Sequence, residues 1–177
     1  MKYKKGTLDQ IDGFVLLGFG LNRLANGQIS PGKSNLKLAQ WVIENNPHQL
    51  PTITQMGTYL ALKQLEKRDP SLEIDRWAIN LPHDDGVHVD TYGAALQIWL
   101  ICENVGLEKV ALVTHPWQSA RAYRIFKKLP ISDVVMPALP PVPFDRQSIQ
   151  IWTRRPWLYL LYEFGLARPI GRLFGWL

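Results

Sequence analysis

Two loops of this chain hold most of the residue types that can carry acid–base or anion chemistry. HDDGVHVDT, residues 83–91, combines two histidines with three aspartates, and THPWQSAR, residues 114–121, adds a third histidine and an arginine. Histidine titrates near neutrality, so His115 is the candidate acid or base. The guanidinium of Arg121 can hold a carboxylate or phosphate through two parallel hydrogen bonds. An alternative for Arg121 is a structural ion pair with Asp84, Asp85 or Asp90.

The carboxylates and imidazoles of residues 83–91 are also ligand types for a divalent metal. Their spacing matches no metal signature, so we assign no metal to them. Solvated loop acids, with Asp90 capping the following helix, are the commoner outcome for such a segment. Asp85 stays a candidate for ligand binding.

Two glycine-containing segments can approach an anion. Gly18-Phe19-Gly20 follows an apolar run, where glycine lets the backbone come close to a phosphate, although a tight exit from a strand is the alternative. GQISPGKS, residues 27–34, matches the phosphate-loop pattern GxxxxGK[ST]. It starts nine residues after Gly18, however, and no clear Walker B aspartate follows a strand. We therefore favour a loop in which Ser34 caps the next helix, from which Lys33 could still meet an anion.

Short apolar runs alternate with helical patterns along the chain, which is typical of a parallel α/β sheet. The expected strands cover residues 13–18, 50–54, 76–80, 109–114 and 131–136. The expected helices cover residues 34–46, 58–68, 90–105, 116–129 and 156–168, with a polar loop at 19–33 and a four-proline loop at 137–147. Right-handed crossovers place helices on both faces. The sequence therefore predicts an N-terminal extension, residues 1–12, and one doubly wound α/β domain, residues 13–177.

In such sheets, ligands bind outside the carboxyl ends of the strands, near the point where the strand order reverses. The segments that follow the expected strands therefore carry the candidate site. Its candidate ligand-binding residues are Gly18, Gly20, Asn22, Lys33, Gln55, Gly57, Asp85, Thr91, Thr114, Gln118 and Arg121, with His115 as the candidate catalytic residue.

The composition is that of a globular protein, with 46% of the 177 residues hydrophobic and 20% charged. A net charge of +5 favours anionic ligands but is too weak to imply nucleic acid. The single cysteine, Cys102, excludes an internal disulfide framework and indicates a reducing compartment. No signal-peptide core follows the basic start MKYKK, and no apolar run of about 18 residues occurs, so we expect a cytoplasmic protein.

The last 27 residues are aromatic and basic, with seven of the nineteen aromatic residues and four arginines. Basic amphipathic segments with Trp and Phe can lie in a membrane interface, which predicts peripheral contact with the inner membrane. The alternative is a terminal helix docked on the sheet with some of its arginines exposed. The apolar run 157–162 is too short to span a bilayer.

Several motifs in residues 13–177 resemble the SanA/ElyC/YdcF family. They are the GFG exit, the turn at 55–57, the acidic loop before Thr91, VTHPWQSARA at 113–122, and the tail around Glu163 and 175–177. The resemblance implies a Rossmann-like three-layer α/β/α fold with a mostly parallel sheet, and it implies a link to cell-envelope biogenesis. It also makes S-adenosylmethionine a candidate cofactor.

Each motif of the family can be matched to positions in this sequence. The glycine-rich exit, the turn, the acidic residue and the threonine fall on Gly18, Gly20, Gln55 to Gly57, Asp85 and Thr91. The strand-to-helix motif falls on Val113, Thr114, His115, Gln118, Arg121 and Ala122. The family has serine where His115 stands and histidine where Gln118 stands. An acid–base role of the family histidine therefore does not transfer directly, and His115 is the candidate replacement.

These observations predict a protein that binds a small anionic or nucleotide-like ligand at the carboxyl edge of its sheet. Two other classes of function stay open. One is a non-catalytic adaptor at the inner membrane that uses the basic aromatic tail. The other is a P-loop-type nucleotide hydrolase that depends on Lys33.

Overall fold

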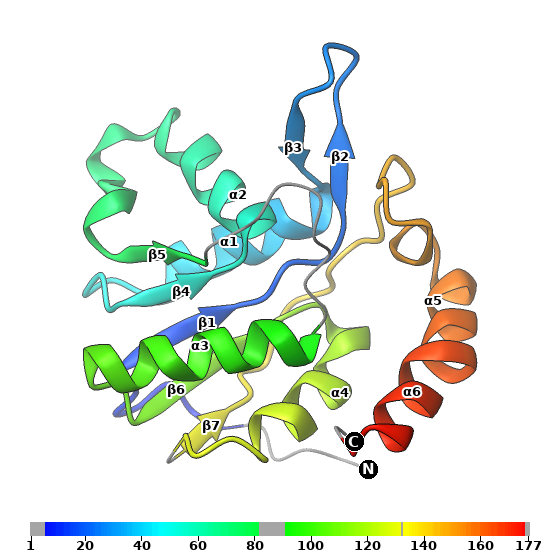
Figure 1. Cartoon of the computed structure of the whole chain (residues 1–177). Coiled ribbons are helices and arrows are strands. Elements are labelled where there is room, and N and C mark those ends of the chain that lie inside the picture. The colour runs from blue at the N-terminus through cyan, green and yellow to red at the C-terminus, as the bar shows by residue number, and fades with distance from the viewer. Residues whose placement is uncertain (1–5, 82–90, 132, 176–177) are drawn as a thin grey trace.

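The computed structural model describes residues 6–81, 91–131 and 133–175, and a five-stranded parallel sheet forms its centre (Figure 1). The strands are β1 (Gly13–Leu16), β4 (Thr52–Thr54), β5 (Ala78–Asn80), β6 (Lys109–Val113) and β7 (Asp133–Val135). They lie in the order β5-β4-β1-β6-β7, and each neighbouring pair is parallel. From β1 the chain adds β4 and β5 on one side, and it then crosses the sheet to add β6 and β7 on the other side. The strand order therefore reverses between β1 and β6, which makes this gap the topological switch point.

Helices cover both faces of the sheet. Those that alternate with the strands are α1 (Lys33–Asn45), α2 (Met56–Glu66), α3 (Thr91–Val105) and α4 (Pro116–Phe126). Phe14 and Leu16 belong to the core beneath α1 and α2, whereas Val15 and Leu17 belong to the core beneath α3 and α4. Successive side chains of a strand point to opposite faces, so the apolar run of β1 serves both cores. The doubly wound, Rossmann-like three-layer fold is confirmed.

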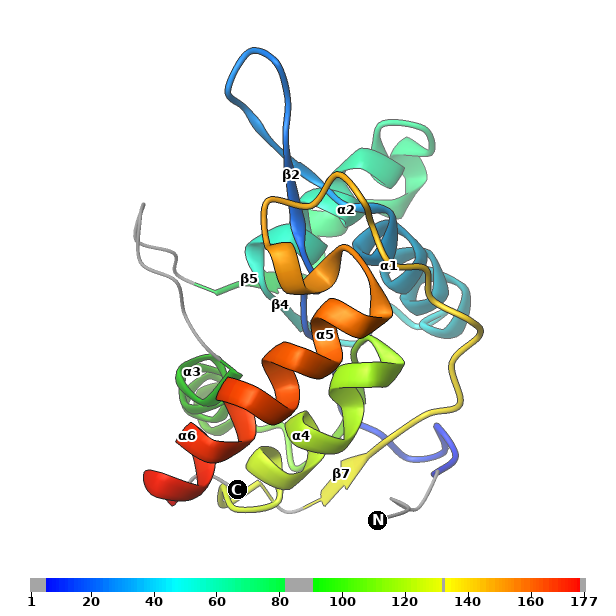
Figure 2. The same cartoon turned by 90° about the vertical axis from the view of Figure 1, so that its right-hand side faces the viewer.

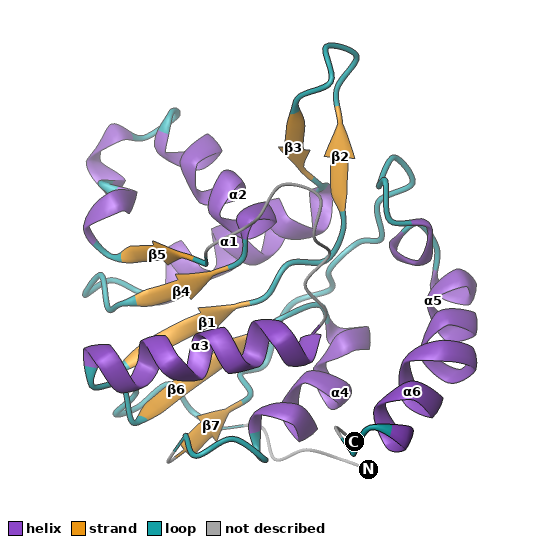
Figure 3. Ribbon diagram, in the orientation of Figure 1, coloured by secondary structure: helices purple, strands orange, loops and turns teal. Residues whose placement is uncertain are grey.

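A hairpin replaces the polar loop that we expected at residues 19–33 (Figure 3). Its strands β2 (Leu21–Arg23) and β3 (Ile29–Pro31) pair antiparallel. Both strands are short and only partly buried, so they lack the apolar alternation that marks a longer strand. The prediction that Ser34 caps α1 is wrong. Gly32 occupies the N-cap, and the Ser34 hydroxyl donates to the Pro143 carbonyl oxygen at 2.6 Å.

The C-terminal arm, defined here as residues 145–175, runs alongside α4 (Figure 2). It contains the 3₁₀ helix η3 (Ile151–Thr153), α5 (Pro156–Tyr162), the π-helical turn η4 (Glu163–Ala167) and α6 (Arg168–Leu173). The helix expected at 156–168 is therefore longer and contains a π turn. Two further 3₁₀ helices precede β5, namely η1 (Pro70–Leu72) and η2 (Ile74–Arg76). Within the described ranges, every helix is too short or too polar to cross a bilayer.

Candidate ligand-binding site

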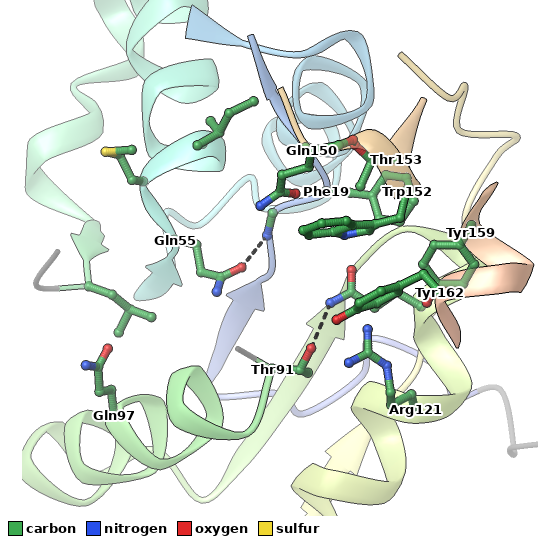
Figure 4. A pocket seen from close by; sticks show the side chains of 17 residues that line it. Phe19, Gln55, Thr91, Gln97, Arg121, Gln150, Trp152, Thr153, Tyr159 and Tyr162 are labelled. Atoms are coloured by element: carbon green, nitrogen blue, oxygen red, sulfur yellow. Dashed lines mark hydrogen bonds between the residues drawn. The ribbon is translucent and has the colours of Figure 1, made fainter. Parts of the chain in front are cut away.

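A pocket of about 130 Å³ lies at the carboxyl edge of the sheet, beside the switch point between β1 and β6 (Figure 4). One water molecule needs about 10–15 Å³, so the pocket can hold a chemical group of several atoms. Its walls come from the loop after β1, from α2, α3 and α4, and from the C-terminal arm. The general rule for ligand position in open parallel sheets therefore selects a real cavity here.

Seven of the residues predicted to bind ligand line this pocket. They are Gly18, Gly20, Gln55, Gly57, Thr91, Gln118 and Arg121. Four other candidates, Asn22, Lys33, Thr114 and His115, are not part of its lining. Asp85 and the rest of residues 82–90, with the histidines and aspartates of that loop, lie outside the described residues.

The backbone that leaves β1 is held by two side chains. The amide of Gly18 donates to Gln55 Oε1 at 2.7 Å, and the amide of Phe19 donates to Asn35 Oδ1 at 2.8 Å. Asn35 Nδ2 in turn donates to the carbonyl oxygen of Gly20 at 2.5 Å. Both amides are thus satisfied inside the protein, so the GFG exit shapes the pocket floor rather than offering these N–H groups to a phosphate.

Gly20 is required by close packing against the C-terminal arm. Its φ is +80°, a region that glycine adopts readily and other residues rarely. A Cβ atom there would lie 2.6 Å from Thr153 Oγ1 and 2.7 Å from Ser148 Oγ. The arm therefore sits directly on the exit of β1 and closes that side of the pocket.

The N-terminus of α1 holds a carboxylate of the protein itself. Asp145 Oδ2 accepts hydrogen bonds from the Lys33 amide at 2.8 Å and from Asn22 Nδ2 at 3.0 Å. Burial opposes the charged form, but the hydrogen bonds from the Lys33 and Gln147 amides outweigh it and keep the pKa of Asp145 below its usual value. In a phosphate loop this position belongs to the nucleotide phosphate. Residues 27–34 thus match the pattern in letters but form a hairpin strand and a helix start instead.

His115 lies in an aromatic cluster. Its ring is fully buried and stacks on Phe19, with ring centroids 3.8 Å apart, and it meets the edge of Phe144 at 4.8 Å. Nδ1 accepts a hydrogen bond from the Trp117 amide at 3.3 Å, so the imidazole caps α4. Burial lowers the pKa of His115 to about 4, and an interaction with the Val142 backbone offsets only part of that shift. The ring is therefore neutral at pH 7 and packed away from the pocket, which favours a structural role.

Arg121 lines the pocket and also pairs with Glu163 of the C-terminal arm. Arg121 Nε lies 3.0 Å from Glu163 Oε2, and the Tyr159 hydroxyl donates to the same oxygen at 3.2 Å. Arg168 Nε donates to the other oxygen, Oε1, at 3.1 Å. Burial disfavours the charged guanidinium, but Tyr159 and Glu163 outweigh it, so the pKa of Arg121 is raised. Arg121 thus has a structural partner, Glu163, whereas the partners expected from the sequence, Asp84, Asp85 and Asp90, lie outside the described residues.

The C-terminal arm supplies pocket residues that sequence reasoning did not assign to the site. The arm residues missed in this way are Gln150, Trp152, Thr153, Tyr159 and Tyr162, and Gln97 of α3 was missed as well. Trp152 and Tyr162 stack with centroids 4.8 Å apart and ring planes 14° from parallel. The aromatic content of the tail is the available signal, although the sequence alone predicts from it a membrane contact or a docked helix. The signal for Gln97 is weaker, because it is a single amide side chain within an otherwise apolar helical stretch.

The pocket combines one guanidinium, several amides and hydroxyls, and an aromatic stack. Gln118 Nε2 donates to Thr91 Oγ1 at 3.4 Å, which orients both side chains at the pocket edge (Figure 4). The lining is more polar than apolar, because four glutamines and several hydroxyl groups lie beside the aromatic rings. Converging polar groups of this kind fix the orientation of a bound molecule in small-molecule sites. The amides and hydroxyls can form hydrogen bonds with a polar group, and the aromatic rings can stack on a planar one.

A comparison of this chain with models of protein families, with curated proteins and with solved structures finds no match. The resemblance to the SanA/ElyC/YdcF family therefore stays a prediction that rests on the motifs quoted above.

Proposed function

We propose that the protein binds a small anionic or nucleotide-like ligand in the pocket at the switch point. The observation that carries this proposal is the position of Arg121. Among the described residues that line the pocket, it is the one formal cation, and its pKa keeps it charged at any physiological pH. A guanidinium at a largely water-excluded site is a strong partner for a carboxylate or phosphate.

The composition of the pocket favours one negative group over several. Arg121 already faces the Glu163 carboxylate at 3.0 Å, so little positive charge remains to neutralise a polyphosphate. The stacked Trp152 and Tyr162 offer an aromatic surface for a planar or sugar ring. S-adenosylmethionine, suggested by the family resemblance, has an adenine ring and one carboxylate, and these groups match the aromatic stack and Arg121. The link to cell-envelope biogenesis and a cytoplasmic location belong to the same proposal.

A thermal-shift titration tests ligand binding. The probes are S-adenosylmethionine, Mg-ATP, farnesyl phosphate and inorganic phosphate, each added to the full chain. A compound at about 100 times its Kd stabilises the fold by about 2.7 kcal/mol, which is easily detected. Trp152→Ala should abolish the shift, whereas Trp157→Ala, on an exposed face of the same arm, should leave it intact. The proposal fails if no probe shifts the protein, or if both variants behave alike.

A second candidate function is a non-catalytic adaptor at the inner membrane. The observation that favours it is the exposure of large apolar side chains along α5 and α6. A third, hydrolysis of a nucleotide by a phosphate loop, loses its support because Asp145 fills the N-terminus of α1.

A further inference from the structure

The C-terminal arm combines side chains that are buried against the protein with side chains that are exposed to solvent. Its inner side carries Tyr159 and Glu163, which are nearly fully buried against the pocket and α4. Its remaining surface carries large apolar side chains, each more than half accessible: Trp157, Leu161, Phe164, Leu166, Leu173 and Phe174. We call these six residues the outer face. Trp157, Leu161 and Phe164 stand four and three residues apart, a spacing that places them on one side of the helical rod. Single exposed hydrophobic residues are ordinary, but several on one short rod mark an interaction surface.

The charged residues of this arm are mainly basic. Residues 145–175 contain five arginines and two acidic residues, Asp145 and Glu163. Both carboxylates are buried: Asp145 accepts from the Lys33 amide, and Glu163 is engaged by Arg121 and Arg168. Arg155 and Arg172 are exposed near the two ends of the helical rod. Among the described residues of the arm, the outer face thus combines exposed apolar side chains with arginines near both ends and no exposed carboxylate.

We infer that the outer face docks the protein on the interface of an anionic lipid bilayer. The apolar side chains would enter the boundary between headgroups and acyl chains, while Arg155 and Arg172 would meet lipid phosphates. Trp157 and Phe164 are residue types that favour this boundary. Glu163, Arg168 and Arg172 interrupt the rod, and no helix among the described residues is long and apolar enough to span a bilayer, so the protein would lie on the membrane rather than cross it.

Charge complementarity argues against a second copy of the chain as the occupant. In a two-fold dimer the same patch faces itself, so the outer faces of both copies would meet. Each copy would then bring its exposed arginines to the contact without an exposed carboxylate to pair with them. A bilayer rich in anionic lipid provides both the apolar phase and the negative charge that this strip lacks.

This docking goes beyond the proposed ligand binding and does not depend on it. It has one geometric consequence for that site, however. The inner side of the same arm contributes Trp152, Tyr159 and Tyr162 to the pocket. A protein held by its outer face would therefore keep the pocket within one helix diameter of the lipid surface, about 10 Å.

Co-sedimentation of the full chain with vesicles tests the inference. The vesicles contain phosphatidylcholine alone, or phosphatidylcholine with about 30% phosphatidylglycerol. We expect binding to the anionic vesicles, and weaker binding when salt rises from about 0.1 M to about 1 M, because the screening length falls from about 10 Å to about 3 Å. Replacing Arg155 and Arg172 together by Gln should lower the partition coefficient about twenty-fivefold, since each basic residue near the surface contributes about fivefold.

A pair of matched double variants separates the outer face from exposed apolar residues in general. Leu161→Asp with Phe164→Asp should abolish sedimentation, whereas Leu100→Asp with Val105→Asp, at exposed positions on α3, should leave it unchanged. Circular dichroism and thermal unfolding confirm that both variants fold. The inference is overturned if the wild-type chain stays in the supernatant or if both variants sediment equally. It is also overturned if ultracentrifugation shows a dimer that dissociates in the Leu161/Phe164 variant.

Discussion

The segment that follows β6, residues 114–121, places its side chains in two different environments. Its first part, with His115, lies in an aromatic cluster, whereas its second part, with Gln118 and Arg121, lines the pocket. Both ionisable side chains are largely buried: His115 is 0% exposed, and the Arg121 side chain is 11% exposed. Yet the pKa of His115 falls to about 4 while that of Arg121 rises.

The difference comes from the charge partners rather than from burial itself. His115 has aromatic rings on its faces and no carboxylate beside it among the described residues, so burial removes its charge. Arg121 has Glu163 at 3.0 Å and two tyrosines nearby, so it keeps its charge despite burial. A histidine at the carboxyl end of a parallel strand is therefore weak evidence for acid–base chemistry until its surroundings are known.

The largest expected effect comes from breaking the Arg121–Glu163 pair on one side. Arg121→Met leaves the Glu163 carboxylate buried with fewer partners and should lower the free energy of unfolding by about 4 kcal/mol. Urea denaturation measures this change. Combining it with Glu163→Gln removes the uncompensated charge, so the double variant should recover much of the loss. Equal destabilisation of the single and double variants would contradict this account of the pair.

The His115 side of the comparison predicts a pH dependence of stability. The pKa of His115 is about 4 in the folded protein and about 6.5 in the unfolded chain. Because the folded value is the lower one, the neutral ring contributes fully above pH 6.5, and that contribution is lost as pH falls toward 4. The loss reaches about 3 kcal/mol.

The variant His115→Phe isolates this effect, because phenylalanine keeps the stacking and does not titrate. Urea denaturation between pH 4 and 7 should give a flatter stability profile for His115→Phe than for the wild-type chain. If the two profiles are parallel, burial in the aromatic cluster does not lower the pKa of His115, and this account of the residue is wrong.

The smallest effect is expected at Lys33. The hydrogen bond described for Lys33 comes from its backbone amide, which donates to Asp145; its exposed side chain adds a weak charge interaction with the same carboxylate and does not line the pocket. Lys33→Ala should change the free energy of unfolding by no more than about 0.5 kcal/mol and leave ligand affinity unchanged. An isothermal titration with Mg-ATP checks this. Loss of Mg-ATP binding in the variant would instead revive the phosphate-loop hypothesis.

The sequence allowed the sheet and its helices to be predicted because they depend on local periodicity. The run GFVLL and the run KVALV are apolar and short, and each is followed by a helical pattern. The carboxyl edge of the sheet could also be predicted as the site, because the position of ligands in parallel sheets follows from the strand order.

The rest of the site depends on contacts between distant parts of the chain. Asp145 caps a helix that starts 112 residues earlier in the sequence, and Glu163 meets an arginine on a different helix. No local pattern marks either pairing. The arm's aromatic residues were visible in the sequence, but only the fold shows that one side of the arm builds the pocket and the other side stays exposed.

The most direct test of the central claim compares two variants that share a neutral residue at position 163. Glu163→Gln keeps Arg121, and Arg121→Met with Glu163→Gln removes it, so neither leaves a buried carboxylate without its arginine. Isothermal titration with S-adenosylmethionine, farnesyl phosphate and inorganic phosphate gives the affinities. The account predicts that at least one probe binds Glu163→Gln and binds the double variant about tenfold or more weakly, as expected for a charged hydrogen bond. Equal affinities, or no binding by either variant, would contradict it.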